Sequence, residues 1–160
     1  ENNMADTNKD GRATHFSGLA IAPRFLSSTT LTLVDADAGK TIITDIAATQ
    51  TITLPTATGS GNVYTVIIGV TATGDKVIQC GNTTDEFAGI VYQVDSDTGD
   101  ALVAYPAVDA DGFDTITLDG STTGGLAGDK IIAVDIASGL FHLEGHTVGT
   151  GTVASPLSAA

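Results

Sequence analysis

The sequence predicts an all-β protein, and three observations support this prediction. Threonine, valine and isoleucine, whose β-branched side chains favour strands, make up 50 of the 160 residues. The helix formers glutamate, glutamine, lysine, arginine and methionine together supply only 13 residues. The 19 glycines provide turns between short strands. We therefore expect a β-sandwich or a jelly-roll-like barrel.

Alternation of apolar and polar residues with a period of two marks the individual strands. We expect about nine to eleven strands at short spacing, as in sandwiches and barrels, and the clearest lie near residues 30–33, 51–54, 64–70, 115–118, 130–136 and 140–144. Turns rich in glycine, aspartate or serine separate them, at residues 35–39, 58–61, 73–75, 98–100, 121–128 and 137–139. The last of these turns is short enough to close a hairpin between the final two strands.

Residues 1–27 differ from the rest of the chain and are predicted to form an extended N-terminal arm ahead of a single β domain, residues 28–160. The arm is neutral overall, so the domain carries the whole net charge of −13. Its apolar residues fit neither a helical nor a strand period, and they need a surface on which to lie. The candidate partner-binding residues of the arm are Arg12, His15, Phe16, Leu19, Ile21, Arg24 and Phe25.

The charge of the chain excludes two classes of partner. With 19 acidic and six basic residues, the surface repels nucleic acid and anionic lipid, so we expect neither as a partner. The single cysteine, Cys80, lies in an apolar run and is expected to be a buried thiol. Lys40, Lys76 and Lys130 each follow a glycine-containing turn at the start of a strand. We expect them to be exposed, because lysine there protects a sheet edge from unwanted pairing.

Catalytic motifs are missing from the sequence, so we expect no enzyme. The chain has no Gly-x-Ser-x-Gly nucleophile motif, and its glycine-rich stretch 124–130 lacks the Gly-Lys-Ser/Thr ending of a phosphate-binding loop. It has no tryptophan for an aromatic sugar-binding platform. His142, Glu144 and His146 would share one face of a strand, but they lack the helical spacing of a His-Glu-x-x-His zinc site.

A structural calcium ion is the one cofactor for which the sequence gives any support. Asp109, Asp111 and Asp114 surround a glycine turn, and calcium prefers several oxygen ligands from a flexible loop. The glutamate that completes an EF-hand loop is missing. The ion would therefore stabilise the loop without taking part in catalysis.

The order of strands and turns resembles the small β-rich virion proteins of tailed bacteriophages, above all the head decoration (cement) proteins. The resemblance covers about residues 29–145. It rests on Thr30-Leu-Thr-Leu33, Asp37-Ala-Gly-Lys-Thr-Ile-Ile43, Thr51-Ile-Thr-Leu-Pro55, Val63–Ile68, Gly128-Asp-Lys-Ile-Ile132 and Ser138-Gly-Leu-Phe-His-Leu-Glu-Gly145. Phe141 stands where the aromatic residue of this group is usually tryptophan.

This resemblance implies a structural protein on the outer surface of the virion capsid. Such a protein is a homotrimer bound to the major capsid protein, and here residues 1–27 would clamp neighbouring capsid subunits. Two other functions remain open on the sequence alone. One is a phage fibre or tail receptor-binding domain, and the other is a calcium-stabilised extracellular β-sandwich that binds a ligand.

Overall fold

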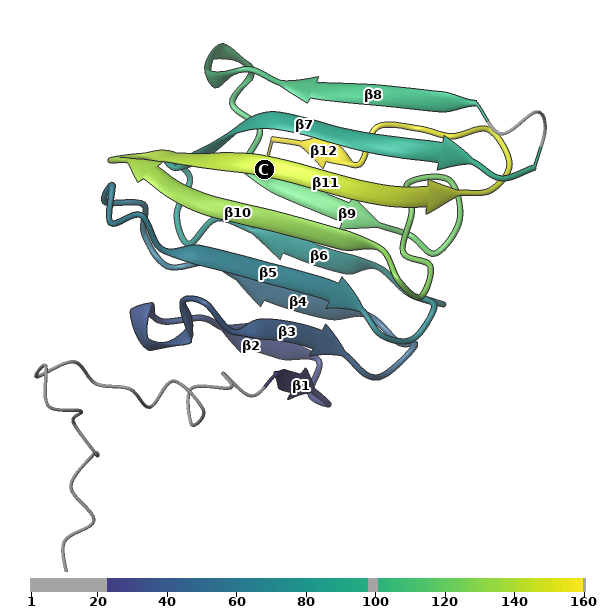
Figure 1. The fold of residues 1–160 in the computed structure, drawn as a ribbon, viewed down its shortest axis with the longest axis horizontal. Helices are drawn as coiled ribbons and strands as arrows, with labels where there is room; N and C mark the ends of the chain where they lie inside the picture. The colour runs from purple at the N-terminus through teal and green to yellow at the C-terminus, as the bar shows by residue number, and fades with distance from the viewer. Residues whose placement is uncertain (1–22, 98–100, 160) are drawn as a thin grey trace, which may run out of the picture.

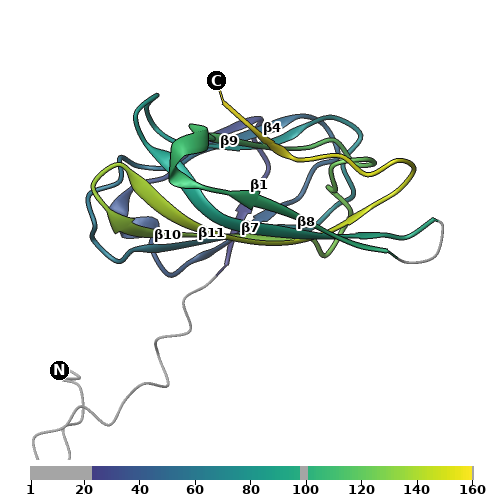
Figure 2. The same cartoon turned by 90° about the horizontal axis from the view of Figure 1, so that it is seen from above.

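Two β-sheets pack face to face in the computed structural model, which describes residues 23–97 and 101–159 (Figures 1 and 2). Two short 3₁₀ turns, η1 and η2, lie among the strands. The elements are β1 (Arg24–Leu26), β2 (Thr30–Thr32), η1 (Asp35–Asp37), β3 (Thr41–Thr44), β4 (Gln50–Thr53), β5 (Val63–Ile68), β6 (Lys76–Gln79), β7 (Glu86–Asp95), β8 (Leu102–Ala107), η2 (Asp109–Asp111), β9 (Thr115–Leu118), β10 (Lys130–Ala137), β11 (Leu140–Gly149) and β12 (Leu157–Ser158). Neither helical turn in these residues is long and apolar enough to cross a membrane.

The all-β class and the sandwich are confirmed, and so is the hairpin predicted near the C-terminus. The larger sheet has the strand order β1-β3-β5-β10-β11-β7-β8, and the smaller sheet has the order β12-β9-β6-β4-β2. Strands β10 and β11 pair antiparallel across a short turn.

The first six strands alternate between the two sheets, so each strand lies beside the one two places earlier. This places β1, β3 and β5 in parallel in the larger sheet, and β2, β4 and β6 in parallel in the smaller one. Jelly rolls are built from antiparallel strands, so this half of the chain has a different connectivity from the predicted jelly-roll-like barrel.

The core of the smaller sheet is one continuous row of aliphatic side chains across its five strands. The row is formed by Leu31, Ile52, Ile78, Ile116 and Leu157, which are paired in register and buried. Each comes from an apolar position of the predicted alternation, and burying one such side chain stabilises the fold by about 1.5–3 kcal/mol.

Aromatic rings fill the facing side of the larger sheet. Phe87 and Phe141 are fully buried and their ring centroids lie 6.2 Å apart. Tyr64 meets Phe141 edge-on at 6.5 Å. Cys80 is 7% exposed and belongs to the same core, as its apolar neighbours predicted.

Buried aspartates hold the glycine-rich loops. Asp135 accepts hydrogen bonds from the backbone amides of Thr58 (3.1 Å), Gly59 (2.6 Å) and Ser60 (3.0 Å), and from the Ser60 hydroxyl (2.6 Å). Burial acts to raise the pKa of this carboxyl, but the hydrogen bonds outweigh it and lower the pKa to about 2. Some of the aspartates that make the chain acidic are therefore buried, where they hold loops through hydrogen bonds instead of lying on the surface.

Lys76 contradicts the expectation of an exposed lysine, because its side chain is 1% exposed. Its Nζ donates to the carbonyl oxygens of Ile46 (2.6 Å) and Ala48, and to Oε1 of Gln50 (3.0 Å). Burial lowers the pKa of Lys76. The lysine lies at the start of a strand, as predicted, but it points inward and holds the turn before β4.

Candidate interaction surface

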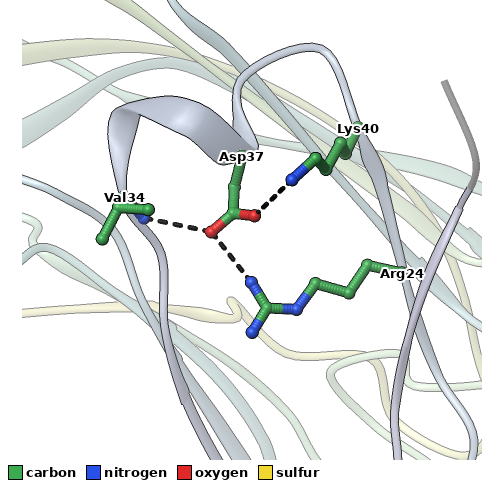
Figure 3. Close-up of polar contacts among 4 residues, drawn as sticks. All are labelled: Arg24, Val34, Asp37 and Lys40. Atoms are coloured by element: carbon green, nitrogen blue, oxygen red, sulfur yellow. Dashed lines mark hydrogen bonds and ion pairs between the residues drawn. The ribbon is translucent and has the colours of Figure 1, made fainter.

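Arg24 is bound within the chain, at the edge of the larger sheet (Figure 3). Its Nη1 lies 2.9 Å from Oδ2 of Asp37, and the Nζ of Lys40 lies 2.9 Å from Oδ1. The amide of Val34 donates to Oδ2 at 3.2 Å. Burial acts to raise the pKa of Asp37, but these hydrogen bonds and the positive charge of Arg24 lower it below its ordinary value. This cluster fastens β1 to the sandwich.

The predicted arm therefore includes a piece of the sheet. Strand β1 pairs in parallel with β3, and Leu26 is 3% exposed within the core. Phe25 lies on the outer side of the same strand and is 60% exposed. A three-residue strand is too short to show a period of two, so the sequence alone did not reveal it. The other predicted arm residues, Arg12, His15, Phe16, Leu19 and Ile21, lie outside the described residues.

The outer side of the larger sheet is mostly apolar, although it does not face the core. The alternation within each strand places these residues opposite the buried ones. We call this surface the apolar face. Its apolar members are Phe25, Ile43, Val63, Ile67, Ala88, Ile90, Tyr92, Val94, Leu102, Ala104, Pro106, Ile132, Val134, Ile136, Leu140 and Val148, and its polar members are Thr41, Thr65, Glu86, Lys130, His142, Glu144 and His146.

The outer side of the smaller sheet has the opposite character, and we call it the threonine face. Val77 is its only aliphatic residue among the strand positions that the structure describes. The other members are Thr30, Thr32, Thr51, Thr53, Gln79, Thr115, Thr117 and Ser158. The two sides of the sandwich therefore differ in polarity, and the larger sheet is the candidate interaction surface.

Strands β7, β8 and β11 run side by side in the larger sheet (Figure 1). Residues of these three strands line an open groove at one end of the apolar face. It has a volume of about 670 Å³. Its walls include Tyr92, Leu102, His146 and Val148. The rings of Tyr92 and His146 are 6.1 Å apart, so one wall of the groove combines an aromatic surface with a titratable nitrogen.

The three predicted calcium ligands do not form one group. Asp109 and Asp111 are exposed in η2, where Oδ2 of Asp111 accepts a hydrogen bond from the amide of Val108 at 3.1 Å. Asp114 is 7% exposed, and its Oδ1 accepts from the Thr115 hydroxyl at 2.8 Å. Within residues 23–97 and 101–159, no three His, Cys, Asp or Glu side chains are grouped to hold a metal ion. The geometry thus gives the calcium hypothesis no support.

His142, Glu144 and His146 share the outer side of β11, as their spacing predicted. Nε2 of His146 lies 3.5 Å from Oε1 of Glu144. All three are members of the apolar face.

Comparison of the chain with protein-family models, with curated proteins and with solved structures found no match.

Proposed function

We propose that this chain is a virion structural protein that decorates and stabilises the outer surface of a tailed-phage capsid. In this proposal it binds the major capsid protein as a homotrimer, and residues 1–22 clamp neighbouring capsid subunits. Its role is attachment, without catalysis.

The apolar face is the observation that carries the proposal. A decoration protein needs an extended surface for other subunits, and the larger sheet presents one while the threonine face is polar. Strand β1 forms one edge of this sheet, and the contact between Arg24 and Asp37 fixes the point at which the preceding residues join it. A pull on residues 1–22 would therefore act on the sandwich itself.

The test measures binding to capsids assembled from the major capsid protein of the same virus. Full-length protein and a form lacking residues 1–22 are each mixed with these capsids and sedimented. We expect saturable binding of the full-length protein and a loss of about tenfold or more for the shortened form, because many weak contacts act together. The full-length variant with Phe16, Leu19 and Ile21 all changed to serine should show the same loss.

Two results would contradict the proposal in different ways. If full-length protein does not bind the capsids, decoration is wrong. If the shortened form binds as tightly as the full chain, the clamp is wrong. Equal thermal unfolding of both forms is the control that the sandwich is intact.

A phage fibre or tail receptor-binding domain is the second candidate function, and the groove beside Tyr92 and His146 favours it. On this alternative, fluorescently labelled protein binds host cells and the His146→Ala variant binds less. Absence of cell binding by the unaltered protein would eliminate this alternative.

A further inference from the structure

The apolar face has the composition of a buried surface. Several of its side chains are strongly exposed in the single chain, among them Leu102 (65%), Phe25 (60%) and Ile136 (50%). The chain contains 16 aspartates, yet no strand position of this face in the described residues is an aspartate. Aliphatic and aromatic residues that lie together with few charged ones among them indicate a surface that another molecule covers.

The size of the face matches a specific protein interface. Seven strands spaced by about 4.8 Å span about 29 Å between β1 and β8. The central strands β10 and β11 have 8 and 10 residues, which at about 3.3 Å per residue extend over about 26–33 Å. Because the outer strands are shorter, the seven strands together cover about 740 Å², close to the area that each partner contributes to an interface of ordinary size.

The charges on the face suit a second copy of the same surface. Its formal charges are those of Lys130 on β10, Glu144 on β11 and Glu86 at the start of β7, beside the two histidines. In a twofold dimer every contact between the two copies occurs twice. Lys130 of each copy can therefore lie opposite Glu144 of the other copy.

We propose that the chain associates with a second copy of itself through the apolar face, with the two larger sheets packed against each other. Stacked sheets pack at about 10 Å with interdigitating side chains, and the rows of isoleucine and valine on this face provide them. The inference goes beyond the proposed function because it concerns the free chain in solution. Both proposals use the apolar face, but self-association is measured without capsids, so its failure can be told apart from a failure of capsid binding.

The experiment is sedimentation velocity of the full-length protein over a wide concentration series, with a matched pair of variants. Val134→Glu places a charge on the apolar face, whereas Val77→Glu places the same charge on the threonine face. Both valines are half-buried on central strands. We expect a species of twice the mass of the 16.1 kDa chain for the unaltered protein and for Val77→Glu, whereas a trimer would contradict the twofold contact. We expect at least about tenfold weaker association for Val134→Glu, because it buries an unpaired charge.

A charge exchange tests the same contact without altering its aliphatic residues. Lys130→Glu and Glu144→Lys should each weaken association, since each sets like charges against each other. An equal mixture of the two variants should associate again, because opposite charges then meet between unlike copies. A general structural defect would not be repaired by mixing.

Three further results would overturn the proposal. They are a single 16.1 kDa species for the unaltered protein at every concentration, association of Val134→Glu equal to that of Val77→Glu, and a mixture that associates no better than its components.

Discussion

Replacing Asp135 by asparagine should weaken the fold by an amount that follows from its surroundings. The carboxylate is 3% exposed and accepts backbone hydrogen bonds from Thr58, Gly59 and Ser60. Its pKa falls from 3.8 to about 2. Each pKa unit corresponds to about 1.4 kcal/mol, so the ionised form contributes about 2 kcal/mol to the free energy of unfolding. Asparagine carries no charge, so this contribution is lost, and its NH₂ group would face backbone N–H groups that are also donors. We therefore expect the free energy of unfolding to fall by about 2–4 kcal/mol.

The pH dependence gives this prediction a second signature. The pKa is lower in the folded state, so the contribution is present above the ordinary pKa of 3.8 and is lost as the pH falls through about 2. The difference in stability between the unaltered protein and Asp135→Asn should therefore shrink across this interval.

The assay is urea unfolding of both proteins at neutral and acidic pH, followed by circular dichroism. Asp75→Asn, at an exposed aspartate, is the control and should change stability by less than about 0.5 kcal/mol. The reasoning is refuted if Asp135→Asn is as stable as the control at neutral pH, or if its deficit persists undiminished at the lowest pH.

Three further predictions follow from the packing. Gly89→Ala should cost more than about 3 kcal/mol, because its φ is +153° and a Cβ would overlap the carbonyl oxygen of Leu143 on the paired strand; thermal unfolding measures this. Cys80 should resist thiol reagents at neutral pH in the folded protein, because burial and nearby acidic groups raise its pKa to about 12; absorbance on labelling measures this. Removing residues 1–27 should destabilise the sandwich by about 2–4 kcal/mol, whereas removing residues 1–22 should not, and denaturant unfolding compares them.

Each of these predictions has its own control. Gly61→Ala tests a positive φ with open space around the new Cβ, so it should cost only about 1 kcal/mol. Full labelling of Cys80 in denaturant shows that the reagent is active, and equally fast labelling of the native protein would contradict the pKa argument. Equal stability of the two shortened chains would mean that Leu26 contributes nothing to the core.

The fold class could be predicted because it depends on local chemistry. Threonine alternating with leucine or isoleucine in residues 30–33, 51–54 and 115–118 defines strands with one apolar side. These strands became β2, β4 and β9 of the smaller sheet, with their apolar sides inward. The hairpin of β10 and β11 could also be predicted, since its two strands are joined by a short turn.

The candidate surface could not be predicted in the same way. Ile42 and Ile43, and likewise Ile131 and Ile132, are adjacent aliphatic residues on opposite sides of their strands. A period of two cannot tell which side faces the core when both sides are apolar. The sheet pairing settles this, and it leaves Ile43 and Ile132 on the apolar face.

The sequence by itself determined an all-β chain with an acidic body, because strand propensity and net charge are sums over residues. Only the tertiary structure decided what individual charges do. Asp135 holds residues that lie 75 to 77 positions earlier in the chain, Arg24 is fastened to Asp37, and Lys76 is buried under backbone carbonyls. These contacts join distant segments, and their energies depend on burial and geometry that no local pattern records.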